Sequence, residues 1–376
     1  MLFTLKFFDT ELITFELSVQ MQTTAVCQII SINTSQKHLL PPGMTPDNEG
    51  LAAWLRERTI PQDREFEEEI FAACGLDFGD TPGMLRLGKG LSLNDCYWIT
   101  DADFKGTFAK CNLFENPFHK ELSLIAFSGY GRLPRKEFIP SPEFTTGGTL
   151  PKGWRKLQGR IKLYKGSTGG ADNTGNEPYS EVFASQIAEA MALKHVPCSL
   201  GSWEGKLCSV CPSFTDLATS FVPMKRICKE KSPEKIAAFL RDLGKTYFDS
   251  FCDMMIFDAL ICNTDRHPGN FGVMVDNQSN QICGFAPLFD HGLSLFNFAM
   301  PEEFDDLDSC AKESCSSSGV SFEDLVSEFI TSRQKKQLDR MQHFKFKCRS
   351  RNNVQAEKSA ALERFLCKRA RFLRMF

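Results

Sequence analysis

The most constraining feature of the sequence is a polar loop, residues 264–270, that follows an apolar helical segment. The segment before the loop, residues 247–262, has apolar residues at helical spacing, and a short apolar run typical of a strand follows at residues 271–275. Within the loop, a Pro-Gly pair separates Asp265 from Asn270 and enforces a tight turn. The fold must therefore present a carboxylate and an amide close together, between a helix and a strand.

A second carboxylate, Asp290, follows another predicted strand, residues 281–285, in the run Pro-Leu-Phe-Asp-His-Gly. Two carboxylates and an amide on neighbouring loops are what phosphoryl transfer needs. In this interpretation Asp265 orients or deprotonates the acceptor hydroxyl, whereas Asn270 and Asp290 hold Mg²⁺ on the nucleotide phosphates. The alternative for the loop alone is structural, because Asp and Asn often stabilise loops by bonding their own backbone. The second carboxylate favours the catalytic interpretation.

The nucleotide-binding half is predicted upstream, in the run of small residues Thr145–Lys152. Its backbone N–H groups can approach phosphate oxygens, although Gly-Gly-Thr is also ordinary turn chemistry. A strand over residues 158–165 follows, and its alternation points the Lys165 ammonium inward, where it needs an anion and a partner carboxylate. Glu181, which opens the next predicted helix, is placed to be that partner. Lys162, on the opposite face, is the second choice for the nucleotide lysine.

Periodicity along the rest of the chain predicts strands early and helices late. Short strands are expected within residues 3–7, 12–16 and 26–30, and short strands with loops from 88 to 138. Helices are expected at residues 47–58, 61–75, 178–193, 233–243, 247–262, 322–330 and 354–376. A hinge to the helical part would fall at residues 221–224. The length of 376 residues suggests two to three domains.

Composition and charge narrow the class of protein. Hydrophobic residues make up 42% and the formal net charge is -3, which excludes a disordered, collagen-like or strongly basic nucleic-acid-coating chain. The 15 cysteines are scattered, as expected of thiols in a reducing compartment. The single CxxC, Cys208 to Cys211, lacks the second pair that a zinc site requires. Neither a signal peptide nor a membrane-spanning stretch is recognised, so a cytoplasmic protein without membrane contact is expected.

Charge is also unevenly distributed along the chain. An acidic run occupies residues 302–308, and a basic tail occupies residues 345–374. Opposed patches of this kind usually serve solubility or contact each other, and less often bind a partner.

The motifs together resemble those of HipA-like serine/threonine kinases, which are bacterial kinases of the toxin–antitoxin type. The run Thr-Gly-Gly-Thr-Leu-Pro-Lys, the strand that ends in Lys165 and the helix of Glu181 resemble the nucleotide half of that family. The run Asn-Thr-Asp-Arg-His-Pro-Gly-Asn-Phe, residues 263–271, and the later Pro-Leu-Phe-Asp, residues 287–290, resemble its catalytic and metal-binding half. Residues 39–75 are similar to its N-terminal subdomain, so the resemblance covers most of the chain in the right order.

The resemblance implies an α+β, protein-kinase-like two-lobed fold with an additional N-terminal subdomain and a mostly helical C-lobe. Residues 1–95 would form the subdomain, residues 96–223 the nucleotide-binding N-lobe, and residues 224–376 the catalytic C-lobe. The cofactors implied are ATP and Mg²⁺. The implied roles are Asp265 as catalytic base, Asn270 and Asp290 as metal ligands, and Thr146, Gly147, Gly148, Thr149, Lys152, Lys165, Glu181 and His267 as cofactor-binding residues.

The resemblance also implies an activity and partners. Members of the family phosphorylate protein Ser or Thr, in some cases on an aminoacyl-tRNA synthetase or translation factor, and autophosphorylate near the Gly-rich loop. The candidate autophosphorylation sites here are Ser141, Thr145, Thr146 and Thr149. An antitoxin-like partner is implied as well. No helix-turn-helix is evident, so direct nucleic-acid binding is not expected, and operator binding would come through that partner.

Two departures from ordinary protein kinases keep other functions open. Thr264 precedes Asp265 where those kinases have His-Arg, and the run Asp-Arg-His-x-x-Asn also resembles phosphoinositide kinases. Asp290 is followed by His-Gly, so the glycine of the usual Asp-Phe-Gly run is kept but its Phe is absent. The alternatives are a non-catalytic, nucleotide-sensing regulator that acts through an antitoxin-like partner, and a lipid or small-molecule phosphotransferase.

Overall fold

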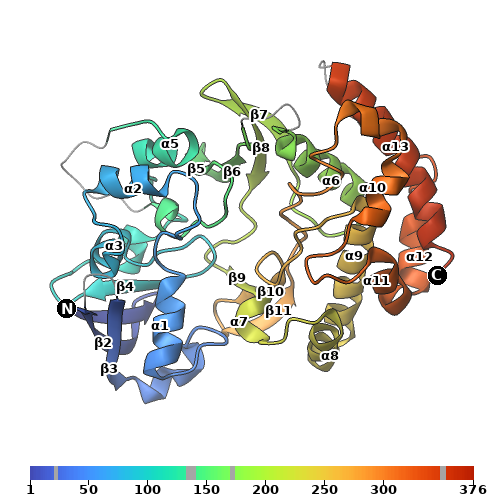
Figure 1. Cartoon of the computed structure of the whole chain (residues 1–376). Helices are drawn as coiled ribbons and strands as arrows, with labels where there is room; N and C mark the ends of the chain where they lie inside the picture. The colour runs from blue at the N-terminus through green and yellow to red at the C-terminus, as the bar shows by residue number, and fades with distance from the viewer. Residues whose placement is uncertain (21–23, 133–140, 170–173, 348–352) are drawn as a thin grey trace. The chain divides into compact units, whose positions relative to one another are not determined.

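The computed structural model describes all residues except 21–23, 133–140, 170–173 and 348–352 (Figure 1). The chain divides into two compact units, each of which is described by itself. Unit 1 comprises Met1–Gly166, Pro212–Val222 and Met274–Cys283, and unit 2 comprises Ser167–Cys211, Pro223–Val273 and Gly284–Phe376.

Unit 1 begins with a four-stranded sheet. Its strands are β1 (Leu2–Phe7), β2 (Thr10–Gln20), β3 (Thr24–Ile32) and β4 (Tyr97–Asp101), in the order β3-β2-β1-β4. β1 pairs antiparallel with both β2 and β4. Because side chains alternate across a strand, Phe3, Leu5 and Phe7 all point into the core, where they are buried. The three early strands predicted from the sequence are confirmed.

The first helix of unit 1, α1 (Asn48–Arg56), is confirmed where its capping residue predicts it. The Asp47 carboxylate accepts a hydrogen bond from the Gly50 N–H at 2.7 Å, which satisfies one of the free donors of the first turn. The further helical elements of unit 1 are η1 (Thr34–Leu39), α2 (Glu67–Cys74), α3 (Thr81–Gly88), α4 (Phe108–Cys111), α5 (Lys120–Ser128) and η2 (Pro142–Phe144).

Two expectations for this part of the chain are wrong. The helix predicted to start at Pro61 starts at Glu67, because Phe66 adopts a left-handed conformation with φ 61° that no helix can include. Its predicted end at Gly75 is confirmed. Residues 88–138 were expected to form short strands and loops, but their described part contains β4 and the two helices α4 and α5. The apolar residues of α5 pack on η2 and on α2, contacts that local periodicity does not reveal.

The strand predicted over residues 158–165 is confirmed as β6 (Arg160–Lys165), and it is the second strand of a hairpin. β5 (Lys152–Leu157) and β6 (Arg160–Lys165) pair antiparallel, and Gln158 and Gly159 form the turn with φ values of 51° and 75°. Glycine adopts such a left-handed conformation without steric cost. The hairpin pairs Lys152 directly with Lys165.

A three-stranded sheet of order β11-β10-β9 is formed by β9 (Thr219–Pro223), β10 (Gly272–Asp276) and β11 (Gln281–Phe285). The two short strands predicted after the polar loop are thereby confirmed. The chain passes from unit 1 into unit 2 at Pro223, within the segment predicted as a hinge.

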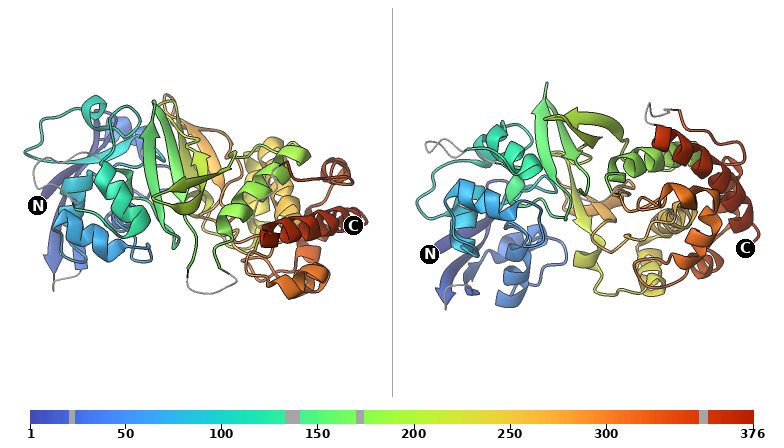
Figure 2. Two further views of the ribbon diagram at one scale, coloured as in Figure 1. Left: turned by 90° about the horizontal axis from the view of Figure 1, so that it is seen from above. Right: turned by 45° about the horizontal axis from the view of Figure 1, so that its top comes forward.

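Unit 2 is mostly helical and is built around α9 (Lys245–Ile261), which is buried from Phe251 to its end. Helices α8, α11, α12 and α13 all pack against α9 (Figure 1), and they form one bundle in the further views (Figure 2). The elements of unit 2 are α6 (Glu177–Met191), β7 (Ser199–Trp203), β8 (Lys206–Pro212), α7 (Met224–Ile227), α8 (Pro233–Leu243), α9, η3 (Pro301–Asp305), α10 (Leu307–Glu313), α11 (Phe322–Phe329), α12 (Ser332–Asp339) and α13 (Asn353–Leu373).

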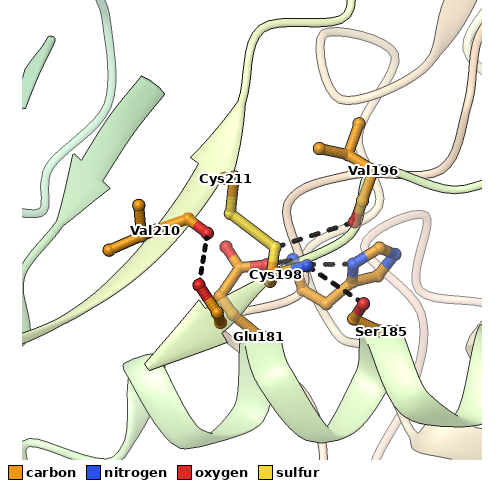
Figure 3. The surroundings of a disulfide bond; sticks show 8 residues. Glu181, Ser185, Val196, Cys198, Val210 and Cys211 are labelled. Atoms are coloured by element: carbon orange, nitrogen blue, oxygen red, sulfur yellow. Dashed lines mark hydrogen bonds and ion pairs between the residues drawn. A yellow bond between two sulfur atoms is a disulfide. The ribbon is translucent and has the colours of Figure 1, made fainter. Parts of the chain in front are cut away.

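One disulfide departs from the expectation that all cysteines are thiols. Cys198, just before β7, is bonded to Cys211 at the end of β8, and the pair lies over α6 (Figure 3). Cys208 of the CxxC run is buried and takes no part in the disulfide. Strand pairing brings Cys198 and Cys211 together across the hairpin, a pairing that the sequence analysis did not predict.

No helix in the described part of the chain combines the length and the apolar character needed to cross a membrane.

Candidate active site

The polar loop of unit 2 is a series of tight turns that starts where α9 ends. Cys262 closes the helix in a left-handed conformation, and its N–H donates to the Asp258 carbonyl. The Asp265 N–H then donates to the Asn263 side chain at 3.2 Å. The Asn270 N–H donates to the His267 carbonyl at 2.8 Å. The Pro-Gly pair thus turns the chain back within a few residues, as the sequence predicts.

These turns bring the predicted base and a predicted metal ligand together. The Asn270 amide nitrogen donates to the Asp265 carbonyl oxygen at 3.1 Å and lies 3.5 Å from the carboxylate Oδ2 of Asp265. Asn270 is buried, whereas Asp265 is only half-buried. An acceptor hydroxyl can therefore reach the Asp265 carboxylate, which a general base requires.

His267, predicted to bind the cofactor, bonds within the loop. Its Nδ1 accepts a hydrogen bond from the Gly269 N–H at 3.0 Å, and its ring is exposed. A role of this side chain on phosphate stays a prediction. The contact shown is one that stabilises the turn.

Asp290 lies in a short loop whose two flanking residues are both held. Its φ of 62° is left-handed, a conformation that costs a non-glycine residue energy and must be imposed by its surroundings. On one side, the Phe289 carbonyl accepts from the Arg266 guanidinium at 2.8 Å. On the other, the His291 N–H donates to the Glu181 carboxylate at 3.1 Å. Glu181, in the second turn of α6, therefore contacts the residue next to a predicted metal ligand.

Two buried residues of this half, Asp258 and Arg266, were given no role by the sequence. Burial by itself lowers the pKa of Arg266, but the hydrogen-bonded Asp258 carboxylate, and then the charges of Asp290 and Glu181, raise that pKa above its ordinary value. Arg266 is thus a permanent positive charge among three carboxylates. The signal available in the sequence was an arginine inside the polar loop together with an aspartate in the apolar helix before it.

The predicted phosphate loop lies in unit 1, directly after η2. Its first two hydroxyls bond inside unit 1: Thr145 donates to the Leu91 carbonyl at 3.0 Å, and Thr146 donates to the Pro142 carbonyl at 2.8 Å. Gly148 lies beside the Lys152 ammonium and has a φ of 99°. The structure thus brings Gly148 and Lys152 together, and the positive φ favours glycine at position 148.

The two candidates for the nucleotide lysine, Lys165 and Lys162, differ in burial. Lys165 is 7% exposed and Lys152, directly opposite on β5, is 8% exposed, whereas Lys162 is only half-buried. The prediction that Lys165 points inward is confirmed. Directly opposed residues of an antiparallel pair share a face, so the two ammonium groups lie on one side of the hairpin.

A buried ion pair connects the segments on either side of this loop. The Arg64 guanidinium contacts the carboxylate of Glu143, and both side chains are completely buried. The same guanidinium donates to the Lys152 carbonyl at 3.3 Å, and the Glu143 carboxylate accepts from the Trp154 N–H at 2.7 Å. Complete burial raises the pKa of Glu143, because desolvation outweighs the attraction of Arg64. The pair ties the residues before the loop to the strand after it.

Some predicted contacts join residues of different units. Lys165 belongs to unit 1 and Glu181 to unit 2, so their ion pair stays a prediction. The same holds for binding of one nucleotide by both halves.

Comparison with known proteins identifies the fold. No family model matches the sequence. A curated relative, the serine/threonine-protein kinase CtkA of Helicobacter pylori, is 26% identical over 138 residues, which are 32% of this chain and 41% of CtkA. The chain therefore spans less than half the length of this relative. The crystal structure of CtkA is 17% identical, with a TM-score of 0.45 over 59% of this chain and 94% of CtkA.

A solved structure of HipA from Shewanella oneidensis, in complex with HipB and operator DNA, matches almost the entire chain. The TM-score is 0.56 at 11% identity, over 98% of this chain and 97% of HipA. At this identity the likeness establishes the fold. The chain has the α+β, protein-kinase-like fold of HipA, and the resemblance to HipA-like kinases that its motifs predict is confirmed at the level of the fold.

Proposed function

We propose that this protein is a Mg-ATP-dependent serine/threonine kinase of the HipA-like type, which transfers the γ-phosphate of ATP to a protein hydroxyl. The observation that carries the proposal is the loop of unit 2, in which Asp265 and Asn270 are hydrogen-bonded neighbours and Arg266 reaches the segment of Asp290. The local similarity to a serine/threonine-protein kinase supports it.

The donor atoms of this loop fit magnesium. Because the Asn270 amide nitrogen donates to Asp265, its amide oxygen is left for a cation, and the half-buried Asp290 adds a carboxylate. Mg²⁺ prefers such hard oxygen ligands and takes few from the protein, keeping phosphates and waters as the others. In the described residues no cluster of three His, Cys, Asp or Glu side chains suits a metal, which a site of one amide and one carboxylate does not need.

The residues then have distinct tasks in the reaction. When bound, Mg²⁺ and ATP supply the phosphoryl group and neutralise its charge. Lys165 and Lys152 bind phosphate oxygens, and backbone N–H groups of Gly147 and Gly148 approach them. The half-buried Asp265 carboxylate orients the acceptor hydroxyl and takes its proton. Catalysis of this kind depends on positioning and charge, which a rigid loop supplies.

Autophosphorylation is proposed at Thr149. Of the four candidate hydroxyls, Ser141 is completely buried, and Thr145 and Thr146 donate hydrogen bonds to backbone carbonyls. Thr149 is exposed on the phosphate loop. A hydroxyl that is phosphorylated must give up its burial or its hydrogen bonds to reach a γ-phosphate. The exposed Thr149 has the least of these to give up.

The proposed partners follow from the comparisons and the resemblance. The HipA structure contains HipB and operator DNA. We therefore propose an antitoxin-like protein partner in the cytoplasm, through which any contact with DNA would come. The proposed substrate is a protein serine or threonine, for which a translation factor or an aminoacyl-tRNA synthetase is the first class to test.

The test is incubation of the full chain and a lysate with Mg-ATP, followed by intact-mass and peptide mass spectrometry. We expect phosphate on Thr149 and on lysate proteins. Asp265→Asn should lower the rate of transfer by about 10²- to 10⁴-fold, because a general base contributes that much. Asp103→Ala, which removes an exposed carboxylate far along the chain, is the matched control. Bound ATP with no phosphate on any protein would instead favour the nucleotide-sensing regulator.

A further inference from the structure

We propose that Arg266 is the positioning residue of this site: anchored by Asp258, its guanidinium sets the place of Asn270 relative to Asp290, the two predicted magnesium ligands. The inference rests on the proposed function, and it assigns the residue on which assembly of that metal site depends. Neither the sequence motifs nor the comparisons give Arg266 or Asp258 a role.

The anchor is a two-point ion pair on α9. The Arg266 Nε donates to Asp258 Oδ2 at 2.8 Å, and Nη2 donates to Oδ1 at 3.1 Å. The two side chains are 3% and 4% exposed. Asp258 is itself fixed, because its Oδ1 also accepts from the Asn263 amide at 2.9 Å. A planar guanidinium held at two points has its third nitrogen aimed in one direction.

That third nitrogen joins two separate stretches of chain. Arg266 Nη1 donates to the Asn270 carbonyl at 2.8 Å and to the Phe289 carbonyl at 2.8 Å. The first carbonyl belongs to one predicted metal ligand, and the second belongs to the residue before the other. One side chain therefore sets the separation between the backbone of the polar loop and the backbone of the Asp290 loop.

The Asp290 loop is also held from its other side. The Glu181 carboxylate accepts from the His291 N–H at 3.1 Å and lies 3.9 Å from the His291 ring Nδ1. Asp290 thus has a left-handed conformation between two held neighbours. Arg266 bonds to the residue before it, and Glu181 bonds to the residue after it. A strained conformation persists only when its surroundings determine it. Loss of the hydrogen bond from Arg266 should free the backbone on the Phe289 side of Asp290.

Lysine cannot replace Arg266 in this arrangement. An ammonium is a compact point charge and lacks the planar fork, so it can keep the charge beside Asp258 without holding both carbonyls. Magnesium demands near-ideal octahedral geometry, so a small shift between Asn270 and Asp290 should weaken the metal site while the catalytic carboxylate stays in place. Residues behind metal ligands typically change metal affinity or activity by about 10- to 100-fold.

The experiment measures metal binding and transfer separately. Mn²⁺ binding is followed by electron paramagnetic resonance with a non-hydrolysable ATP analogue, and phosphate transfer is followed as a function of Mg²⁺ concentration. We expect Arg266→Lys to weaken Mn²⁺ binding by about 10- to 100-fold and to raise the Mg²⁺ concentration for half-maximal transfer by a similar factor. Circular dichroism confirms that each variant is folded. Asp258→Asn keeps the shape of its side chain, carries the same expectation, and replaces Arg266→Lys if that variant does not fold.

The matched control is Asp253→Asn on the same helix. Asp253 pairs with Arg333 at 2.7 Å, five residues before Asp258, and its ion pair holds α12 and not the polar loop. This variant should lose stability and keep the metal requirement of the parent protein. An equal loss of Mn²⁺ affinity in Asp253→Asn and Arg266→Lys would overturn the proposal, since it would reflect general destabilisation.

The outcomes also separate this inference from the proposed function. A folded Arg266→Lys variant with the parent Mn²⁺ affinity and Mg²⁺ requirement overturns the positioning role, whether or not the protein is a kinase. A parent protein that binds Mn²⁺ with the ATP analogue but transfers no phosphate contradicts the kinase, and the Arg266→Lys comparison still decides the positioning role. No Mn²⁺ binding by the parent protein overturns both.

Discussion

At the scale of single residues, burial separates two lysines that the sequence could only rank. Lys162 and Lys165 stand on opposite faces of β6, and only Lys165 is buried, next to Lys152 on β5. The buried pair offers two positive charges on one face, and a half-buried lysine offers no such concentration of charge. Burial therefore favours Lys165 over Lys162 as the nucleotide lysine.

The first prediction tests this choice. Lys165→Met should lower transfer from Mg-ATP by about 10²-fold or more, because it removes a charge aimed at the phosphates, whose stabilisation dominates phosphoryl transfer. Lys162→Met, the matched control, should keep activity within about threefold, as solvent-accessible charges contribute little. Initial rates at several ATP concentrations measure both. The assignment is wrong if Lys162→Met is the more damaging substitution.

Burial of Lys358 on α13 makes its contribution to the free energy of unfolding depend on pH. Its side chain is 3% exposed, and its ammonium donates to the Phe296 carbonyl at 2.7 Å. Burial lowers the pKa of Lys358 to about 8, against the opposing influence of Glu177. The unfolded chain has the ordinary lysine pKa of about 10.4. Between these values the unfolded state holds a proton that the folded state has released.

The second prediction follows from that difference. The contribution of Lys358 to the free energy of unfolding should rise with pH from about 8 to about 10.4, by about 3 kcal/mol in total, and stay constant below pH 8. Urea denaturation at pH 7, 8, 9 and 10 measures it. Lys358→Met should lose this rise, whereas Lys336→Met, at an exposed site of α12, should keep it. Parallel pH profiles for the parent protein and Lys358→Met would contradict the predicted shift.

At the scale of elements, long-range contacts decide boundaries and partners. The hairpin β7–β8 lies beside α6, the helix that carries Glu181, and its disulfide is fixed to that helix by a bond from the Cys198 N–H to the Ser185 hydroxyl at 3.1 Å (Figure 3). The register of the hairpin brings Cys198 and Cys211 together, although Cys208 is closer to Cys211 in sequence. Strand pairing therefore selects the partner.

The third prediction concerns this disulfide, which closes a loop of 13 residues. Cys198→Ser should lower the free energy of unfolding by about 2–4 kcal/mol under oxidising conditions, because the crosslink restricts the unfolded chain. Thermal unfolding is recorded with and without dithiothreitol. The reductant should destabilise the parent protein and leave Cys198→Ser unchanged. Cys283→Ser, at an exposed free thiol, should respond as the parent does. A parent protein insensitive to the reductant would refute the prediction.

At the scale of the whole molecule, charge is distributed so that opposed segments meet. The basic tail contacts the acidic run through Lys368 and Asp308 at 2.5 Å, and through Arg364 and Asp305 at 3.9 Å. Contact between the two patches was one of the expectations from sequence. These ion pairs are largely exposed, so each contributes little to stability. The acidic run and the basic tail thus neutralise each other locally within unit 2.

The fourth prediction concerns ligand binding by the whole chain. Mg-ATP at about 100 times its dissociation constant should stabilise the folded protein by about 2.7 kcal/mol, because it binds the folded state alone. Thermal unfolding with ATP, with and without Mg²⁺, measures the shift. Asp265→Asn should keep the Mg²⁺-dependent part of the shift, since the base is no metal ligand, whereas Asp290→Asn should lose most of it. Equal shifts in both variants would argue against Asp290 as a ligand.

Much of the fold was predictable from local patterns. Local patterns predicted α8, α9, α11 and the strands β1, β10 and β11, because their apolar residues recur at helical spacing or form short apolar runs. The start of α2 and the turn at Gln158 were not predicted, because each depends on a non-glycine residue in a left-handed conformation, Phe66 and Gln158. Local patterns carry no information about contacts made across the fold.

In the candidate site, too, local patterns predicted some features and only long-range contacts decided the others. By itself the sequence determined the chemical groups and their order, namely a base and an amide on one tight loop, a second carboxylate after a hairpin, and a small-residue loop upstream of lysines. Only the tertiary structure decided that Arg266 joins the two loops, that Glu181 reaches the neighbour of Asp290, and that Lys152 is buried directly opposite Lys165. Spacing along the chain restricts which residues can meet locally, whereas burial and packing determine which distant ones do.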